Sequence, residues 1–371
     1  MNRIRQITVL GQAIWLDYIS RDLVRSGKLA DLVEEGITGV TSNPTIFHQA
    51  ITGSSIYDED IRRLAQEGRN AAEIGEVLTL GDVGEAADCL RPTYNETHGR
   101  DGFVSLEVNP HLAHDTAGTI AEARRLFHTL HRPNVMIKVP ATPAGVPAIS
   151  TLIGEGINVN ATLIFAVSMY ERVIEAYLDG LSRFQGTGAP LGLVSSVASF
   201  FVSRVDTLTD KILDHRINHG EPHLEPLYGL AAIANAKLAY QRYKAVFEGS
   251  RFEPLRSLGA RPQRPLWAST SAKNPAYPDT KYIDPLIGVN TVNTVPPATL
   301  AAVRDHAVTA QTIERDLDRA HSLMAEFASL KIDMDWITGV LLDEGVQAFA
   351  DSYDKLLADI EKKRLAMQQP V

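Results

Sequence analysis

The hydrophobic residues of the chain gather in short runs, separated by longer stretches with helical spacing. Most of the short runs are continuous rather than alternating, which is typical of parallel strands that helices cover on the outside. We therefore interpret these runs as strands. They are residues 13–17, 39–43, 103–108, 135–140, 157–165, 191–199, 265–271 and 288–295.

The stretches between the predicted strands carry helix signals. Residues 115–130 place an apolar stripe on one helix face, interrupted by one arginine. That stripe consists of Ile120, Ala123, Arg124 and Phe127.

Two further helices show signals for their first turn. Residues 168–181 begin with Ser168, which predicts an N-cap, and Glu171 is spaced to complete a capping box. Pro296 and Pro297 predict a helix that opens with proline in its first turn.

Strand and helix alternate eight times along the chain, which favours an α/β fold of the (β/α)8 TIM-barrel type. Such a barrel uses about 250 residues. The surplus lies in insertions around 52–100 and 206–260 and in C-terminal helices around 321–371. None of these segments has the composition of a linker, so we expect one domain over residues 1–371.

Composition narrows the classes of function. The chain has 36 Lys and Arg against 45 Asp and Glu, and this net charge of −9 argues against nucleic acid as a partner. No apolar run is long enough to span a membrane, and no signal-peptide pattern is visible. The single cysteine, Cys89, excludes an internal disulfide and fits a reducing compartment. We expect a cytoplasmic protein without a membrane partner.

Polar side chains follow the ends of nearly all the predicted strands. In a barrel these ends converge on one mouth, where active sites lie. A strand-end asparagine can instead cap the next helix, and for Asn43, which Pro44 follows, the two explanations are equally good. The convergence of so many polar ends favours a site. The residues are Asp17, Asn43, Glu107, Lys138, Asn160 with Thr162, Ser199, Ser271, and Asn293 with Thr294.

Lys138 is the most informative of these residues because it lies inside an apolar strand. A structural ion pair with a neighbouring strand, or a side chain that extends to the mouth, would explain it without chemistry. Burial of an ammonium group in general lowers its pKa, so that more of the group is present as the neutral, nucleophilic amine. Such an amine forms a Schiff base with a ketone and assists cleavage of the adjacent C–C bond. Glu107 and Asp17, the carboxylates within the strand runs, would handle protons.

Two segments resemble the signatures of the transaldolase family of class I Schiff-base enzymes, and the long stretches at 52–100 and 206–260 resemble those of its longer bacterial members. The two signature segments are GVTSNPTIF at 39–47 and VMIKVPATPAGVPAISTLIGEGINVNATLIF at 135–165. The resemblance continues through SSVASFFVSRVDTLTDK at 195–211 and WASTSAKNP at 267–275, and so covers essentially the whole barrel.

The resemblance implies catalytic roles for four residues. Lys138 would form the Schiff base, and Glu107 would act as acid and base through a water that Thr162 also positions. Asp17 would take the proton of the C4 hydroxyl group as the C3–C4 bond breaks.

The resemblance also implies how the substrate is held. Hydroxyl groups of the dihydroxyacetone fragment would contact Asn43, Asn160 and Ser199, and the phosphate would contact Arg204, Ser271 and Lys273. Many relatives have an arginine as the second phosphate cation, whereas Lys273 would be a point charge rather than a bidentate fork.

The implied reaction belongs to carbohydrate metabolism, in the pentose phosphate pathway, and needs no cofactor or metal. This transferase would move dihydroxyacetone from sedoheptulose 7-phosphate to glyceraldehyde 3-phosphate, giving erythrose 4-phosphate and fructose 6-phosphate. Its partners would be sugar phosphates, and the sequence leaves monomer and homodimer open.

Three alternatives differ in their sequence support. A Schiff-base aldolase that cleaves fructose 6-phosphate without transfer would use the same site. A barrel that binds sugar phosphates without catalysis would require the loss of Asp17, Glu107 or Lys138, and all three are present. A metal-dependent aldolase is disfavoured because His111 and His114 have no evident third ligand nearby.

Overall fold

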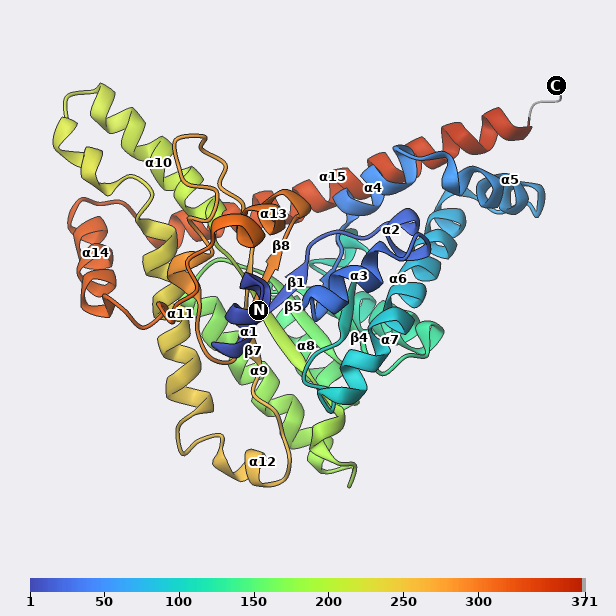
Figure 1. Cartoon of the computed structure of the whole chain (residues 1–371), viewed down its shortest axis with the longest axis horizontal. Helices are drawn as coiled ribbons and strands as arrows, with labels where there is room; N and C mark the ends of the chain where they lie inside the picture. The colour runs from blue at the N-terminus through green and yellow to red at the C-terminus, as the bar shows by residue number, and fades with distance from the viewer. Residues whose placement is uncertain (369–371) are drawn as a thin grey trace.

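Eight parallel strands form a closed barrel at the centre of the computed structural model, which describes residues 1–368. Each strand pairs with the next along the chain, and β8 pairs with β1 to close the ring (Figure 1). The predicted barrel is thereby confirmed. The strands are β1 (Gln12–Leu16), β2 (Gly39–Thr41), β3 (Phe103–Glu107), β4 (Val135–Pro140), β5 (Val159–Ile164), β6 (Ser196–Phe201), β7 (Arg264–Ala268) and β8 (Thr291–Val295).

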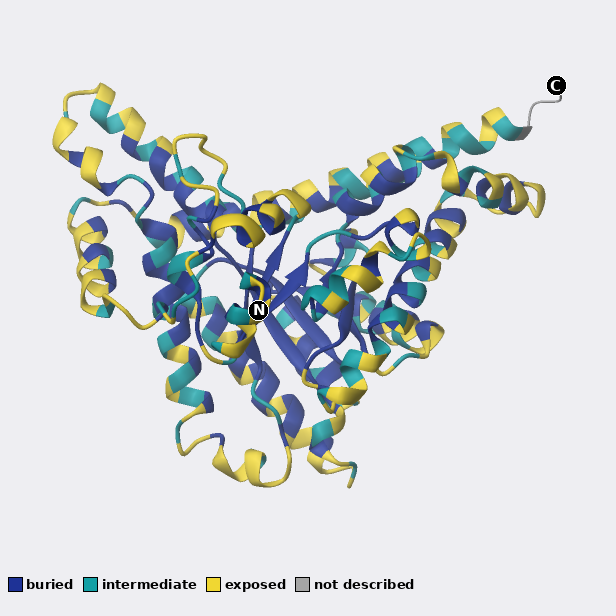
Figure 2. Cartoon of the chain, in the orientation of Figure 1, coloured by how far each residue is buried: buried dark blue, intermediate teal, exposed yellow. Residues whose placement is uncertain are grey.

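All residues of the eight strands are buried. Figure 2 shows the strands in the colour of buried residues, while the outer faces of the surrounding helices are exposed. Side chains inside the barrel and side chains under the helices both avoid water, which explains why the strands read as continuous apolar runs.

Three predicted strand boundaries differ from the structure by three residues or more. In the eighth run the strand begins at Thr291 rather than at residue 288. In the sixth run the strand begins only at Ser196, because Leu191–Leu193 form a turn of 3-10 helix (η3). In the seventh run the strand ends at Ala268, since Ser269 adopts a left-handed backbone with φ of 55°. Ser271 therefore lies in the loop after the strand.

Fifteen α-helices surround the barrel in the part of the chain that the structure describes. They are α1 (Arg3–Val9), α2 (Arg21–Arg25), α3 (Lys28–Glu35), α4 (Pro44–Thr52), α5 (Asp58–Gln66), α6 (Ala71–Glu96), α7 (Thr116–Leu130), α8 (Gly145–Gly154), α9 (Val167–Gln185), α10 (Ser203–Asn218), α11 (Ala231–Phe247), α12 (Glu253–Ser257), α13 (Pro297–His306), α14 (Leu317–Ser329) and α15 (Met334–Gln368).

The helix predicted at 115–130 is present, but its buried stripe is rotated from the predicted one. Arg124 is exposed and forms an ion pair with Glu155. This pair keeps the guanidinium group in water, so a neighbouring row of side chains faces the barrel. The buried residues are Thr119, Ala123, Leu126 and Leu130.

The predicted capping box at Ser168 is wrong. Helix α9 begins two residues earlier than that cap predicts, with Ala166 rather than Ser168 at the N-cap position, and no side chain caps it. Glu171 instead lies 2.8 Å from Arg242 of α11 in an ion pair. The helix predicted to open with proline is confirmed, because Pro297 is the first residue of α13.

The segments outside the basic strand–helix alternation form helices. The first insertion contains α5 and α6, and the second includes most of α10, all of α11 and α12. Near the C-terminal end, α14 precedes α15, and α15 packs against α4, α5, α6, α10 and β5 (Figure 1). Residues 369–371 of the predicted C-terminal segment lie outside the described residues.

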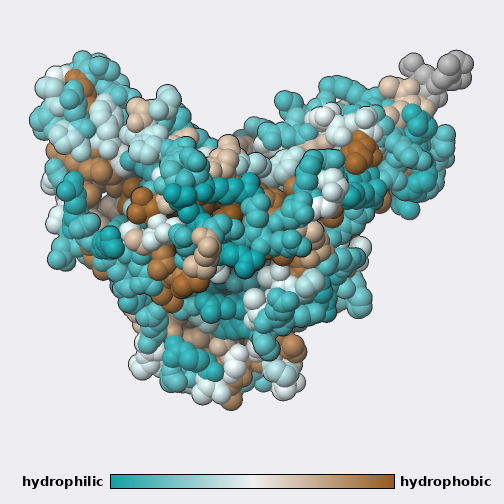
Figure 3. Space-filling model, in the orientation of Figure 1, coloured by the Kyte–Doolittle hydropathy of each residue, from teal (hydrophilic) through white to brown (hydrophobic). Residues whose placement is uncertain are grey.

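The outer surface carries few large apolar side chains. The face in Figure 3 is mostly hydrophilic, with small hydrophobic patches between the helices. Within residues 1–368, no helix combines the length and the apolar character needed to cross a membrane.

Candidate active site

A cavity of about 370 Å³, here called the mouth cavity, opens at the carboxyl ends of the strands. It brings together residues that lie far apart along the chain, as the barrel predicts. Of the predicted site residues, Asp17, Asn43, Lys138, Thr162, Ser199, Arg204, Ser271 and Lys273 line it. Glu107 and Asn160 lie beside it without being part of its lining.

The register of three neighbouring strands aligns the central residues. Glu107 of β3 pairs with Lys138 of β4, and Lys138 pairs with Asn160 of β5. Residues paired in this way point to the same side of a parallel sheet. The three side chains therefore lie next to one another inside the barrel.

Lys138 is almost completely buried, with 4% of its surface exposed. Its Nζ donates a hydrogen bond to the carbonyl of Ser42 at 2.9 Å and lies 3.7 Å from Oε2 of Glu107. The centroid of the Phe349 ring is 5.8 Å from the same nitrogen. The ion pair considered from the sequence is thus present, and it joins the amine to a group that can exchange protons with it.

Glu107 has a perturbed acidity. Burial raises the pKa of its carboxyl group to about 7, and the attraction of Lys138 opposes this shift. Both carboxylate oxygens are buried without a hydrogen-bond partner among the described residues, and the same holds for Oγ1 of Thr162. Buried polar atoms of this kind are ordinarily satisfied by water.

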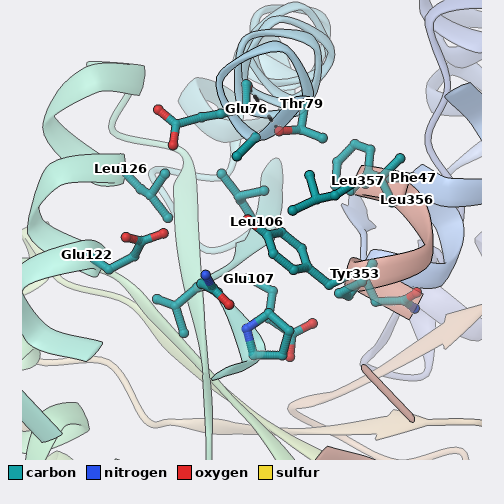
Figure 4. A pocket seen from close by; sticks show the side chains of 17 residues that line it. Phe47, Glu76, Thr79, Leu106, Glu107, Glu122, Leu126, Tyr353, Leu356 and Leu357 are labelled. Atoms are coloured by element: carbon teal, nitrogen blue, oxygen red, sulfur yellow. Dashed lines mark hydrogen bonds between the residues drawn. The ribbon is translucent and has the colours of Figure 1, made fainter. Parts of the chain in front are cut away.

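A small side cavity of about 70 Å³ lies on the other side of Glu107, between β3 and the helices α4, α6, α7 and α15. In Figure 4 the ring of Tyr353 points from α15 toward Leu106 of β3, and Glu76 and Glu122 lie across the cavity. This volume accommodates a few water molecules. Glu107 therefore contributes to a water-sized space that is separate from the mouth cavity.

Asp17 is held at the end of β1 by two hydrogen bonds. Its backbone N–H donates to the carbonyl of Val295 at 2.8 Å, and Thr41 donates from Oγ1 to its Oδ1 at 2.7 Å. Burial raises the pKa of the carboxyl group, while Lys138, Thr41 and Lys273 oppose that shift. Asp17 is therefore a fixed carboxylate that feels the positive charges of the cavity.

Asn43 has the capping role that the sequence left open. Its Oδ1 accepts a hydrogen bond from the N–H of Ile46 at 3.0 Å and so caps α4. It also lines the mouth cavity, with its Nδ2 making no hydrogen bond to the residues that the structure describes. The cap fixes the direction of the side chain and leaves the amide donors available.

Asn160 lies deeper than the sequence indicated. It is fully buried, donates from Nδ2 to Ser105 at 3.1 Å, and accepts a 2.6 Å hydrogen bond from Ser199 at Oδ1. Ser199 itself reaches the mouth cavity. In this structure Asn160 orients Ser199 rather than facing the cavity directly.

The outer part of the mouth cavity is basic. The Arg204 guanidinium group lies 5.8 Å from the Phe201 ring and forms no ion pair within the described part of the chain. Lys273 donates from Nζ to Oγ of Ser271 at 2.7 Å. Burial lowers the pKa of Lys273, and the nearby charge of Arg204 lowers it further. Two mutually repelling cations in one cavity favour an anionic ligand.

A bulge in β5 shapes the wall beside Thr162. The register shifts between Ala161 and Ile164, and Leu163 takes a left-handed backbone with φ of 58°. A Cβ placed on Gly345 of α15 would lie 3.0 Å from Leu163, so glycine leaves space for that side chain. The bulge and α15 thus fit each other, and Phe349 follows one helical turn later.

Sequence reasoning missed several residues of the site. Thr41 and Ser105 hold Asp17 and Asn160, respectively, and Phe349 covers Lys138. Ser105 precedes Glu107 by two residues, so the alternation of strand side chains could have indicated it. No sequence signal placed Phe349 in the mouth cavity, since it comes from a helix outside the barrel.

Metal ligation finds no support in the described residues, where no three His, Cys, Asp or Glu side chains gather as a metal site requires. His111, one of the two histidines considered from the sequence, lies with Nε2 2.7 Å from Asp354.

Comparisons with known proteins cover nearly the whole chain. A family model described as transaldolase/fructose-6-phosphate aldolase matches residues 14–360. A transaldolase of Thiobacillus denitrificans is 47% identical over 361 residues, which cover 97% of this chain and 100% of the relative. A transaldolase of a Parafrankia species is 47% identical and covers 96% of both chains. Transaldolase 2 of a Nostoc species is 44% identical over 372 residues, 98% of each chain.

Proposed function

The chain belongs to the transaldolase/fructose-6-phosphate aldolase family, and from this premise we propose that its transaldolase activity proceeds through a Schiff base on Lys138. The chain is an enzyme of the transaldolase type. The observation that carries the mechanism is the position of Lys138, a buried amine that lines the mouth cavity and lies 3.7 Å from Glu107.

Formation of the Schiff base requires proton transfers at the lysine nitrogen. Glu107, with a pKa of about 7, takes a proton from the ammonium group of Lys138 and leaves a nucleophilic amine. The amine attacks the ketose carbonyl carbon to give a carbinolamine. Glu107 then returns a proton to the departing hydroxyl group, so that water leaves. A water held by Glu107 and Thr162 carries these protons, since the buried oxygens of both residues have no other partner within residues 1–368.

Cleavage of the C3–C4 bond follows from the Schiff base. Asp17 removes the proton of the C4 hydroxyl group, the electron pair of the C3–C4 bond moves toward the iminium nitrogen, and an aldose leaves. The raised pKa of Asp17 suits it to this role as a base and to returning the proton to the acceptor. Transfer is completed when an acceptor aldehyde adds to the enamine and water releases the ketose.

Substrate binding uses the polar and basic walls of the mouth cavity. Arg204 and Lys273 hold the phosphate together with Ser271, because a dianion relieves the repulsion between the two cations. Asn43 and Ser199 contact hydroxyl groups of the dihydroxyacetone fragment, with Asn160 orienting Ser199.

The substrates are sugar phosphates. We assign sedoheptulose 7-phosphate and glyceraldehyde 3-phosphate as donor and acceptor, with erythrose 4-phosphate and fructose 6-phosphate as products. The enzyme would act in the cytoplasm, which the single cysteine of the chain supports.

Trapping the covalent intermediate tests this proposal. Borohydride reduction with fructose 6-phosphate should attach a dihydroxyacetone-derived group to the peptide that contains Lys138, as measured by peptide mass mapping. Lys138→Met should abolish the adduct and retain the fold, since methionine fills a similar volume. An adduct on another lysine, or full turnover of Lys138→Met, would refute the mechanism.

A second buried lysine provides a matched control. Lys237 of α11 is 6% exposed, donates to the carbonyls of Thr312 and Arg315, and does not line the mouth cavity. Lys237→Met should still form the adduct. Addition of erythrose 4-phosphate to the reaction then separates transfer from simple aldol cleavage, because only transfer produces sedoheptulose 7-phosphate.

A further inference from the structure

A third cavity, here called the basal cavity, lies at the amino ends of the strands and has a volume of about 300 Å³. Its walls include Met136, Val197 and Arg264, which stand at or next to the first residues of β4, β6 and β7. The mouth cavity opens at the opposite ends of these strands. The two cavities are therefore separated by the length of the barrel.

Three arginines face the basal cavity, and two of them hold neutral partners. Arg261 donates from Nη1 to Oγ of Ser195 at 3.1 Å and from Nη2 to the carbonyl of His98. Arg100 donates from Nη2 to Oδ1 of Asn290 at 2.9 Å. These contacts use only part of the donors that a guanidinium group offers.

The third arginine has a carboxylate partner. Arg264 is buried, and its Nη2 and Nη1 lie 3.0 Å and 3.3 Å from the oxygens of Asp101. Asp101 also accepts a hydrogen bond from the indole of Trp15 at 3.1 Å. The Asp101 carboxylate therefore has Trp15 and Arg264 as its partners, and its negative charge neutralises only the charge of Arg264.

The basal cavity thus has an excess of positive charge. Among residues 1–368, no carboxylate forms an ion pair with Arg100 or Arg261. Burial lowers the pKa of Arg261, and the neighbouring charge of Arg264 acts in the same direction. An uncompensated, half-buried cation is unfavourable unless an anion approaches it. The excess is notable in a chain whose net charge is −9.

Shape and chemistry together define the ligand. A volume of about 300 Å³ lies at the lower end of the range of small-molecule sites. Guanidinium forks match the oxygens of a phosphate group through paired hydrogen bonds. We propose that the basal cavity is a second anion site, in which Arg100 and Arg261 bind the phosphate group of a small dianion.

The basal cavity takes no part in the Schiff-base chemistry. The mouth cavity is also proposed to bind phosphate, however, so the experiment first removes the cations of the mouth cavity. The background variant is Arg204→Gln with Lys273→Gln. Calorimetric titration with inorganic phosphate should show one binding site per chain in this background. Adding Arg261→Gln should weaken that binding at least tenfold. Absence of phosphate binding in the background variant would overturn the proposal.

A matched control separates the site from general surface charge. Arg319 of α14 is exposed and has no ion pair within the described residues. Arg319→Gln in the same background removes the same charge and should leave the affinity for phosphate within twofold. An equal loss in Arg319→Gln and Arg261→Gln would reduce the effect to net charge and overturn the site.

Arg261→Gln also removes a structural contact, the hydrogen bond to the carbonyl of His98, so a second variant is needed to separate phosphate binding from structure. Arg100→Gln removes a single side-chain hydrogen bond within the described residues, the one to Asn290. It should also weaken phosphate binding at least tenfold, while the unfolding temperature in phosphate-free buffer is retained. Unchanged affinity for phosphate in this variant would mean that the arginines have only a structural role in holding the loops, and would overturn the proposal. Arg261→Gln alone should keep turnover within twofold of the parent chain.

Three probes identify the source of the anion. Tighter binding of glycerol 3-phosphate than of inorganic phosphate would assign a phosphorylated metabolite, and equal binding would assign the free ion. Succinate carries two negative charges without a phosphate group. Binding of succinate as tight as that of phosphate would overturn the assignment to a phosphate group.

Discussion

The carboxyl group of Glu107 is balanced between two opposing effects. Burial raises its pKa, whereas the charge of Lys138 lowers it, and the result is a pKa of about 7. A group with this pKa accepts and releases protons at neutral pH without a large free-energy penalty in either direction. If Glu107 exchanges protons with Lys138 as proposed, its titration should set the pH dependence of the reaction.

Glu107→Gln should remove this pH dependence. In the parent enzyme the ionised carboxylate is needed to take the proton of Lys138, so kcat/KM should rise as pH increases through about 7. The variant lacks the titrating group, and its rate should be lower by about 10²–10⁴-fold without an inflection near that pH. The measurement is kcat/KM from pH 5 to pH 9.

Glu122→Gln is the matched control for this profile. Glu122 of α7 lines the side cavity but is not paired with Lys138. It should preserve the inflection near pH 7. Retention of that inflection in Glu107→Gln would assign it to another group and contradict the role of Glu107.

At the scale of single residues, the sequence allowed prediction of those site residues that are charged but lie in or next to an apolar strand. Lys138, Glu107 and Asp17 stand out because charged residues are rare in or directly after apolar strands. Thr41 and Ser105 are ordinary in strands, so their roles in holding Asp17 and Asn160 became visible only from hydrogen bonds. The catalytic assignments themselves stay predictions until trapping and kinetics are measured.

At the scale of elements, α15 connects the helical surface to the mouth of the barrel. Its Gly345 accommodates the bulge at Leu163 of β5, and one turn later Phe349 lies over Lys138. The ring excludes water from one side of the amine. Helix α15 therefore contributes both packing and an apolar ring beside the buried amine of Lys138.

Phe349→Ala should impair catalysis as well as stability. Loss of a buried aromatic side chain costs about 3–5 kcal/mol of the free energy of unfolding. Water would also reach the amine, and we expect kcat to fall at least tenfold. Urea unfolding and steady-state kinetics on the same preparation measure the two effects.

Ile360→Ala separates these effects. Ile360 is fully buried on the same helix, where it packs near Gly75 of α6 rather than at the mouth cavity. It should destabilise the fold by about 2–5 kcal/mol but leave kcat within twofold for the folded enzyme. An equal decrease in kcat for both variants would show that Phe349 acts through stability alone.

Element types were predictable from the sequence, whereas their boundaries and rotations were less so. The eight apolar runs identified all eight strands because each strand is buried on both sides. The capping box at Ser168 failed, since Glu171 pairs with Arg242 on another helix. Such an interaction depends on tertiary neighbours that a local pattern does not contain.

At the scale of the whole molecule, the insertions and C-terminal helices surround one barrel, and we propose that they unfold with it. Helix α15 packs against both the first insertion and β5. Calorimetry should therefore show a single transition, with equal calorimetric and van't Hoff enthalpies. A separate transition at lower temperature, absent after deletion of residues 334–371, would identify an independent unit.

The global composition predicted the class of molecule better than its sites. A net charge of −9 gives no sign of the cations in the mouth cavity or of the arginines in the basal cavity. Local charge depends on which residues the barrel brings together. Arg204 and Lys273 followed from the family resemblance, while Arg100 and Arg261 required the assembled structure.

The barrel closes only after its last strand has been synthesised, which delays the completion of the site during translation. Strand β1 completes the ring by pairing with β8, where the side chains of Gln12 and Thr291 meet although they are 279 residues apart in the chain. At ~5–20 residues per second, the ribosome needs about 14–56 s to synthesise the residues between them. Asp17 depends on the same closure, because its backbone N–H is bonded to Val295 of β8. A nascent chain therefore carries Lys138 long before it can hold Asp17 in place, and during that interval β1 lacks its β8 partner.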